Sequence, residues 1–318
     1  MRKSFLLFFL ITISSYSQKK MITPPYLQKG DTIAIVSTAR KNIDDNLQPT
    51  IDLLNSWGLK VKIGKTIGLD YYQLAGTDEQ RAADFQEQLD NPNIKAIWCV
   101  RGGYGTVKII DRLDFTKFKQ HPKWIVGFSD VTVLHNHLNN MGFESLHATM
   151  PVAIPRATED AKESLRKALL GEKLEYTLSC DALNHLGKAQ GELVGGNLSI
   201  LYSLLGSESA IDCTDKILFI EDLDEYLYHV DRMMTNLKRN GCLSGLKGII
   251  VGGMTEMKDN EIPWGRNALE IIEDTVKGLN IPIIYNFPAG HIRDNRALIF
   301  GRQISMEVNE TESKVIFE

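Results

Sequence analysis

The chain has 318 residues, which is long for one compact domain and suits two domains with sizeable hydrophobic cores. Hydrophobic residues make up 43% of the sequence and charged residues 24%, as in ordinary soluble globular proteins. The formal net charge of −4 provides no basic surface for a nucleic acid, so we expect no nucleic-acid partner.

The first residues have the pattern of a secretory signal peptide. Arg2 and Lys3 precede the apolar run 5–13, and a short polar stretch with small residues follows it. The run is shorter than the roughly 20 apolar residues that span a bilayer, and the alternative interpretation is a buried N-terminal strand or helix. We predict a signal peptide over residues 1–18, an exported, periplasmic mature protein, and no stable membrane insertion after cleavage.

Strands and helices alternate in the first half of the mature chain. We predict apolar strands at 29–40, 60–65, 95–100 and 124–128. Residues with helical spacing predict helices at 46–58, 78–90, 106–113 and 130–142. Continuous apolar strands alternating with amphipathic helices are typical of a mostly parallel sheet covered on both faces. We therefore predict an α/β domain over residues 23–150 that carries such a sheet.

The alternation of strands and helices weakens from about residue 151. A helix at 161–171 lies within a stretch that is otherwise mixed and polar, so we predict an interdomain connection over residues 151–190. A second group of elements begins at 191–206, and we predict a smaller α/β domain over residues 191–318. Its expected elements are strands at 216–222, 247–254, 281–287 and 297–308 and helices at 225–241 and 267–279.

Export makes the four cysteines relevant, because disulfides persist in oxidising compartments. Four cysteines in 318 residues are too few for a disulfide-based scaffold, and Cys99 lies inside an apolar run. We expect most of them to be buried free thiols and leave their pairing open. No Cys-x-x-Cys pair or Cys/His cluster indicates a structural metal, and we expect neither a metal nor a cofactor. The four are Cys99, Cys180, Cys213 and Cys242.

Polar clusters follow four of the predicted strands. Because sites in α/β sheets form at the carboxyl ends of strands, these clusters are the candidates for chemistry. They are RGGYG (101–105), GFSD (127–130), IEDLDE (220–225) and PAGHIRDN (288–295).

Ser129 lies where a predicted strand turns into a helix, which is the placement of a nucleophile on a tight turn. The pattern G-x-S-x-G is only partly matched, because Val131 stands at its last position. The alternative is a helix N-cap, for which Ser before Asp is well suited. In RGGYG, Gly102 and Gly103 allow a sharp turn, so the loop is an oxyanion site, an anion cradle or a plain strand–helix turn.

A base and an acid complete the candidate set. His291 follows a Pro/Gly turn after a buried strand, a suitable place for a general base. Glu221 lies within its strand, whereas Asp224 and Glu225 fit the first turn of the next helix. Ser129, Glu221 and His291 occur in the chain order of the α/β-hydrolase triad, although such triads are recognised by geometry.

Five motifs together resemble the L,D-carboxypeptidase family of serine peptidases. They are RGGYGTVKIID, VGFSDVTVL, GELVGGNLSIL, LFIEDLDE and FPAGH, in this order from about residue 23 to 308. The resemblance implies a Rossmann-like N-terminal domain and a smaller C-terminal domain that share a catalytic triad.

The resemblance also implies a role for each site residue. Ser129 is the nucleophile, Glu221 orients the base, and His291 is the base. The backbone N–H groups of Asp130 and of the loop around Gly102 and Gly103 form the oxyanion hole. This chain has His147-Ala148-Thr149 where the family often has His-Gly-Pro, and we expect that segment to border the substrate cleft.

We predict a serine carboxypeptidase that releases terminal D-Ala from an L,D bond in peptidoglycan stem tetrapeptides. One alternative is a peptidase of the microcin-immunity type, which cleaves a peptidyl-nucleotide. The other is a periplasmic protein that binds a peptide between two domains without cleaving it. The sequence leaves open which diamino acid precedes D-Ala and whether the protein forms a homodimer.

Overall fold

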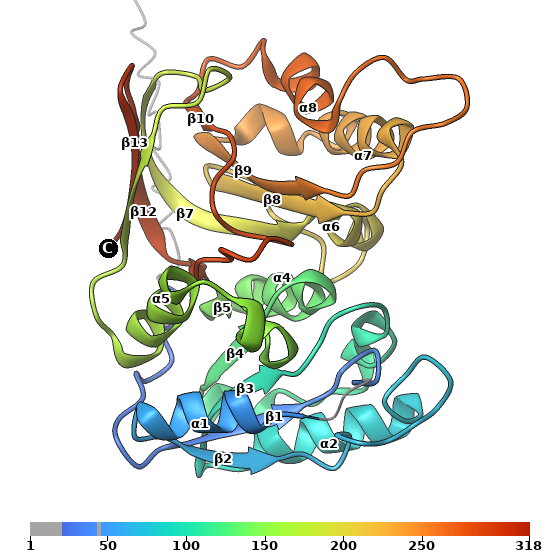
Figure 1. Cartoon of the computed structure of the whole chain (residues 1–318), viewed down its shortest axis with the longest axis vertical. Coiled ribbons are helices and arrows are strands. Elements are labelled where there is room, and N and C mark those ends of the chain that lie inside the picture. The colour runs from blue at the N-terminus through green and yellow to red at the C-terminus, as the bar shows by residue number, and fades with distance from the viewer. Residues whose placement is uncertain (1–20, 43–45) are drawn as a thin grey trace, which may run out of the picture.

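Two β-sheets organise the chain, and they lie one above the other in Figure 1. The computed structural model describes residues 21–42 and 46–318. The predicted signal peptide at 1–18 falls outside these residues. Among the residues described, no helix combines the length and apolar character needed to cross a bilayer.

The N-terminal sheet has the strand order β11-β5-β4-β3-β1-β2, and all of its strands are parallel except the antiparallel edge strand β11. This arrangement confirms the predicted mostly parallel sheet. Its strands are β1 (Thr32–Val36), β2 (Lys60–Ile63), β3 (Ile94–Cys99), β4 (Trp124–Gly127), β5 (Ser145–His147) and β11 (Leu298–Phe300). Its helices are α1 (Gln48–Ser56), α2 (Asp78–Asp90), α3 (Thr116–Gln120) and α4 (Thr132–Met141).

The second sheet has the order β10-β9-β8-β7-β12-β13-β6, with parallel pairing from β10 to β7 and antiparallel pairing beyond. Its strands are β6 (Glu175–Ser179), β7 (Gly187–Asn197), β8 (Ile217–Leu223), β9 (Gly248–Thr255), β10 (Ile283–Ile284), β12 (Gln303–Val308) and β13 (Glu312–Phe317). The remaining helices are α5 (Glu159–Leu170), α6 (Leu198–Leu204), α7 (Leu227–Arg239) and α8 (Ala268–Val276). The predicted α/β class with two sheets is therefore confirmed.

Three predicted elements differ from the structure. The expected helix at 106–113 is two 3₁₀ turns, at Thr106–Lys108 and Ile110–Arg112, because its β-branched residues are poor helix formers. The strand at 297–308 is two strands, β11 and β12, separated at Gly301, whose φ of 88° favours glycine. The polar stretch 172–190 contains β6 and the start of β7.

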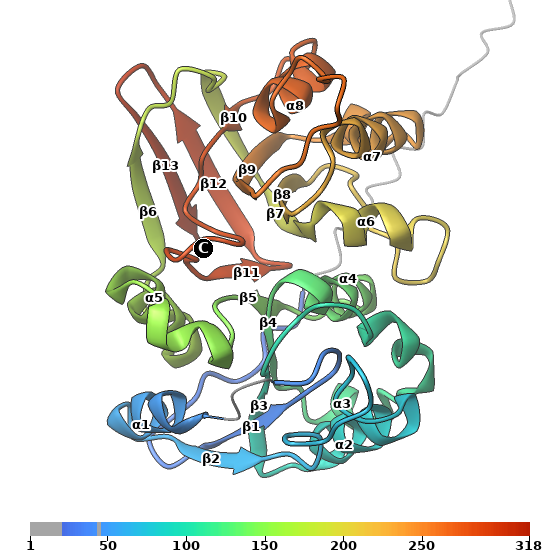
Figure 2. The ribbon, with the colours of Figure 1, turned by 45° about the vertical axis from the view of Figure 1, so that its right-hand side comes forward.

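One hydrophobic cluster spans the two sheets. A single buried cluster includes Trp98 and Trp124 of the first sheet, Phe219 of the second, and Phe300 of β11. Figure 2 shows β11, from the C-terminal part of the chain, beside β5 at the junction. The helix α4 also packs against β5 on one side and β7 on the other. Side chains from the two halves are therefore held in a fixed relation.

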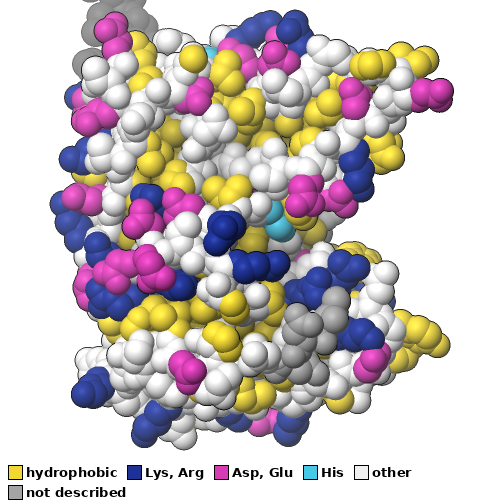
Figure 3. All heavy atoms as spheres, in the orientation of Figure 1, with side chains coloured by type: hydrophobic (Ala, Val, Ile, Leu, Met, Phe, Trp, Pro, Cys, Tyr) yellow, Lys and Arg dark blue, Asp and Glu magenta, His cyan; other side chains and the backbone are white. Residues whose placement is uncertain are grey.

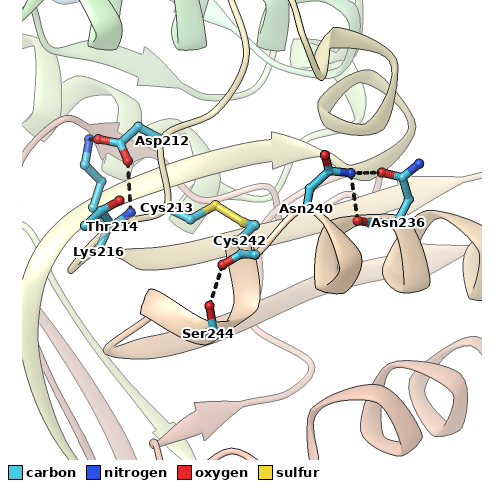
Figure 4. The surroundings of a disulfide bond; sticks show 9 residues. Asp212, Cys213, Thr214, Lys216, Asn236, Asn240, Cys242 and Ser244 are labelled. Carbon is cyan, nitrogen blue, oxygen red and sulfur yellow. Dashed lines mark hydrogen bonds and ion pairs between the residues drawn. A yellow bond between two sulfur atoms is a disulfide. The ribbon is translucent and has the colours of Figure 1, made fainter.

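A disulfide joins Cys213, which precedes β8, to Cys242, which follows α7 (Figure 4). Both residues are buried, and their Cα atoms lie 5.1 Å apart. The expectation that most cysteines are free thiols is wrong for this pair. Cys99 and Cys180 are free, and burial raises the pKa of the Cys99 thiol to about 12, which makes it inert.

Candidate active site

Ser129 lies on a strained turn at the carboxyl end of β4. Its φ of 62° lies in the left-handed region, which non-glycine residues rarely adopt and which is often found at functional sites. The turn leaves Ser129 half-buried as the first residue of a 3₁₀ turn, Ser129–Val131, that leads into α4. Its hydroxyl contacts His291 Nε2 at 3.1 Å and makes no helix-capping bond, so the N-cap alternative is wrong.

His291 connects the hydroxyl to a buried carboxylate. Its Nδ1 lies 2.6 Å from Glu221 Oε2, and its backbone N–H donates to the same oxygen at 3.1 Å. With Nδ1 protonated toward Glu221, Nε2 carries a lone pair and can accept a hydrogen bond from the Ser129 hydroxyl. The structure therefore brings together the three residues predicted from the motifs.

The electrostatics around His291 favour its protonated form. Burial lowers the pKa of His291, but the charge and hydrogen bond of Glu221, helped by Asp222 and Glu256, outweigh burial and raise it above 6.5. Glu221 is fully buried near the carboxyl end of β8. The glycine before His291 permits this contact, because a Cβ on Gly290 would lie 2.7 Å from Glu221 Cβ.

The RGGYG loop approaches Ser129 from β3. A Cβ on Gly102 would lie 3.0 Å from Ser129 Oγ and 3.4 Å from the backbone nitrogen of Asp130. Such contacts are tighter than most Cβ contacts in proteins, so glycine eases the close approach at this position. Gly103 has a φ of 112° and packs against Arg40 instead. The backbone of Gly102 and that of Asp130 therefore flank the hydroxyl.

The side chain of Asp130 was not assigned a role from the sequence. It is fully buried, and its carboxylate accepts from the backbone N–H of Thr106 at 2.8 Å. Burial raises the pKa of Asp130, although bonds from Thr106 and Gly105 oppose that effect. Asp130 thus ties the Ser129 turn to the loop that carries Gly102.

Asn197 is a second residue that sequence reasoning missed. At the end of β7, its Nδ2 donates to Glu221 Oε1 at 3.3 Å and to Asp222 Oδ1 at 2.9 Å. Burial, and then the charge of Glu221, raise the pKa of Asp222 to about 7. The backbone N–H of Asn197 donates to Thr132 Oγ1, at the start of α4, at 3.0 Å. The available signal was its position at the end of the motif GELVGGN, directly after an apolar strand.

The segment 147–149 does not border a cleft as predicted. His147 and Ala148 have no exposed surface and Thr149 is 2% exposed. His147 packs against Phe219 and Phe300, and burial lowers its pKa well below the ordinary value. These residues therefore belong to the interior beneath the site.

The surface is hollowed on one side between the N-terminal and C-terminal halves of the molecule (Figure 3). Basic side chains gather on the lower margin of this hollow, and acidic side chains lie beside basic ones on the upper margin. Ser129 comes from the half below and His291 from the half above. A ligand that enters between the halves therefore meets side chains of both signs.

Family models match both halves of the chain. Residues 33–148 match the LD-carboxypeptidase N-terminal domain, and residues 190–306 match the LD-carboxypeptidase C-terminal domain. The chain belongs to the LD-carboxypeptidase family. The resemblance found in the sequence motifs is thereby confirmed.

Known relatives of this LD-carboxypeptidase family member cover nearly its whole length. A probable murein peptide carboxypeptidase of Bacillus subtilis is 34% identical over 93% of this chain and 94% of its own. The solved structure of a muramoyltetrapeptide carboxypeptidase from Oxalobacter formigenes has a TM-score of 0.80 at 26% identity, covering 90% of this chain and 98% of its own. A microcin self-immunity protein of Escherichia coli is 26% identical over 88% of this chain and 92% of its own.

Proposed function

We propose that this protein is a serine-type L,D-carboxypeptidase that releases terminal D-Ala from peptidoglycan stem tetrapeptides. The observation that carries the proposal is the pair of contacts that His291 makes, 3.1 Å to Ser129 and 2.6 Å to Glu221. A nucleophile, a base and an orienting carboxylate in hydrogen-bond reach form a hydrolytic site. The murein carboxypeptidases among the relatives support the choice of substrate.

In this mechanism, Ser129 Oγ attacks the carbonyl carbon of the bond before D-Ala, and His291 Nε2 takes the hydroxyl proton. His291 then gives that proton to the amine of the leaving D-Ala, so the C–N bond breaks and an acyl-enzyme remains. Water attacks the ester, again with His291 as base, and Ser129 is regenerated. Glu221 holds the Nδ1–H tautomer of His291 throughout.

The negative charge of the tetrahedral intermediate requires donors close to Ser129. The backbone N–H groups of Gly102, Gly103 and Asp130 are the proposed donors, and the close approach of Gly102 to Ser129 Oγ supports this assignment. Removal of one such donor typically costs roughly 10²-fold or more in kcat.

The pH dependence of turnover follows from the raised pKa of His291. Only neutral His291 can act as a base, so kcat/KM should fall as the pH drops through a midpoint above 6.5. Glu256 contributes to the raised pKa through its charge, and its side chain is exposed. Glu256→Gln should therefore move the midpoint to lower pH. A wild-type midpoint below 6.5, or a shift to higher pH in the variant, would contradict the proposed base.

Substrate choice separates this proposal from the two alternatives. The purified mature chain is incubated with a murein tetrapeptide and, separately, with an aminoacyl-sulfamoyl adenylate, and products are followed by mass spectrometry. We expect loss of D-Ala from the tetrapeptide and little hydrolysis of the adenylate. The reverse preference would favour a microcin-immunity peptidase, to which one relative points. Binding of the tetrapeptide without cleavage would indicate a peptide-binding protein.

We infer further that the protein is exported and acts on murein in the periplasm. The signal-peptide pattern at 1–18 supports this inference, as does the Cys213–Cys242 disulfide, because disulfides persist in oxidising compartments. The full-length chain, expressed in a Gram-negative host, should accumulate in the periplasmic fraction with its N-terminus near residue 19. An uncleaved chain in the cytoplasmic fraction would disprove export.

A further inference from the structure

A buried chain of hydrogen bonds runs from the sheet of the nucleophile to the loop of the base. It begins at Trp98 on β3, whose indole Nε1 donates to the carbonyl oxygen of Thr149 at 3.0 Å. Thr149 Oγ1 donates to the carbonyl oxygen of Asn295 at 3.0 Å. Asn295 Oδ1 accepts from the backbone N–H of Gly290 at 2.8 Å. Gly290 directly precedes His291.

Every side chain in this series is buried. Trp98 is 1% exposed, and Thr149 and Asn295 are 2% exposed each. A buried hydrogen bond is costly to break, because the partner left behind has no water to replace it. The series therefore fixes the backbone before His291 more firmly than an equal number of surface bonds would.

The hydrogen-bond series matters because Ser129 and His291 come from different sheets. Ser129 follows β4 of the first sheet, whereas His291 lies on a loop after β10 of the second sheet. The contact between Ser129 Oγ and His291 Nε2 thus depends on the relative position of two parts of the fold. A misplacement of about 1 Å in a reacting group can lower a rate by roughly 10²-fold.

Glu221 holds His291 from one side, through Nδ1 and the backbone N–H. The Asn295 side chain binds the backbone N–H of Gly290, the residue before His291. Thr149, which follows β5 of the first sheet, in turn binds the carbonyl of Asn295. The loop has further ties. Thr158 Oγ1 donates to Asp294 at 2.7 Å and Arg293 donates to the Arg156 carbonyl at 2.9 Å, both less buried, and the backbone N–H of Gly253 donates to the carbonyl of buried Ala289 at 2.9 Å. Loss of the Thr149 bond should therefore loosen the loop without releasing it.

We propose that Thr149 and Asn295 are positioning residues for His291, which set the base against Ser129 by fixing the backbone of Gly290. This inference rests on the proposed function only for its effect on turnover. The geometric part concerns the order of the loop and can be tested without any substrate.

Thr149→Val removes the hydroxyl and keeps the shape of the side chain. We expect kcat for D-Ala release to fall by about tenfold while KM changes by less than about twofold, because the base is misplaced and the binding surface is retained. Thr149→Ser restores the hydroxyl and should recover most of the lost kcat. In Thr149→Val, amide hydrogen exchange at Gly290 should become faster than in the wild type.

A matched control exists in α1. Thr50 is 1% exposed, and its Oγ1 donates to the carbonyl oxygen of Pro151 at 3.0 Å, a bond of the same kind whose two partners both lie outside the His291 loop. Thr50→Val should lose similar stability but keep wild-type kcat and wild-type exchange at Gly290.

Three results would overturn the inference: unchanged kcat in Thr149→Val, an equal loss of kcat in both valine variants, or unchanged exchange at Gly290. If the wild-type protein releases no D-Ala at all, the proposed function fails. The exchange at Gly290 then still decides whether Thr149 orders the loop.

Discussion

Ser129→Ala should lower kcat for D-Ala release by about 10⁴-fold or more, because it removes the atom that forms the acyl-enzyme in the proposed mechanism. Binding of the tetrapeptide should persist, since Ser129 contributes one hydroxyl to a site formed by two halves of the molecule. The free energy of unfolding should change by less than about 1 kcal/mol, as Ser129 is half-buried and is not part of the core. Steady-state release of D-Ala and thermal unfolding measure the two effects.

The chain offers a matched control for this variant. Ser209 Oγ lies 3.0 Å from His137 Nδ1, so Ser209→Ala also breaks a serine–histidine hydrogen bond, but one outside the triad. That variant should keep wild-type kcat. Normal turnover by Ser129→Ala would rule out Ser129 as the nucleophile, and an equal loss in Ser209→Ala would indicate a general effect on the fold.

Glu221→Gln should lower kcat by roughly 10⁴-fold, the scale expected when the orienting carboxylate of a triad is neutralised. The amide can present its NH₂ group to His291 Nδ1, which would favour the wrong tautomer. The charge that raises the pKa of His291 is lost as well. The acid midpoint of the remaining activity should therefore move to lower pH, and the pH profile of kcat/KM measures this shift.

Glu225→Gln is the corresponding control. Glu225 Oε2 lies 2.5 Å from Nδ1 of His229, four residues later in the chain. This change therefore also neutralises a carboxylate that is paired with a histidine. We expect nearly wild-type kcat and an unchanged acid midpoint. If Glu221→Gln retained full activity, or moved the midpoint to higher pH, Glu221 would not have the proposed role.

The parallel sheet of the N-terminal half was predictable because its strands are short apolar runs between amphipathic helices. The strands β6 and β13 were not predictable from the sequence. Each has exposed or half-exposed residues along its length and lies toward the edge of its sheet. The division of 297–308 into β11 and β12 depends on Gly301, where the chain leaves one sheet and enters the other. The hydrophobic periodicity of a segment does not indicate which of two sheets the strand joins.

The three residues of the proposed triad were predictable for a different reason. Ser129 follows a strand, Glu221 lies near the carboxyl end of one, and His291 lies on the loop after another. Their motifs occur in the order of a known family. The supporting residues lack such a signal, because their roles arise from contacts between distant segments. Thr149 meets Asn295 across 146 positions, and the Asp130 side chain meets Thr106 across 24. Only the fold reveals these contacts.

Release of D-Ala from a defined murein tetrapeptide, measured by mass spectrometry, tests the central claim most directly. We expect the mature wild-type chain to convert tetrapeptide into tripeptide plus D-Ala and the Ser129→Ala variant to leave the tetrapeptide intact. No conversion by the folded wild-type chain, or equal conversion by the two proteins, would contradict the assignment of Ser129 as the nucleophile of an L,D-carboxypeptidase.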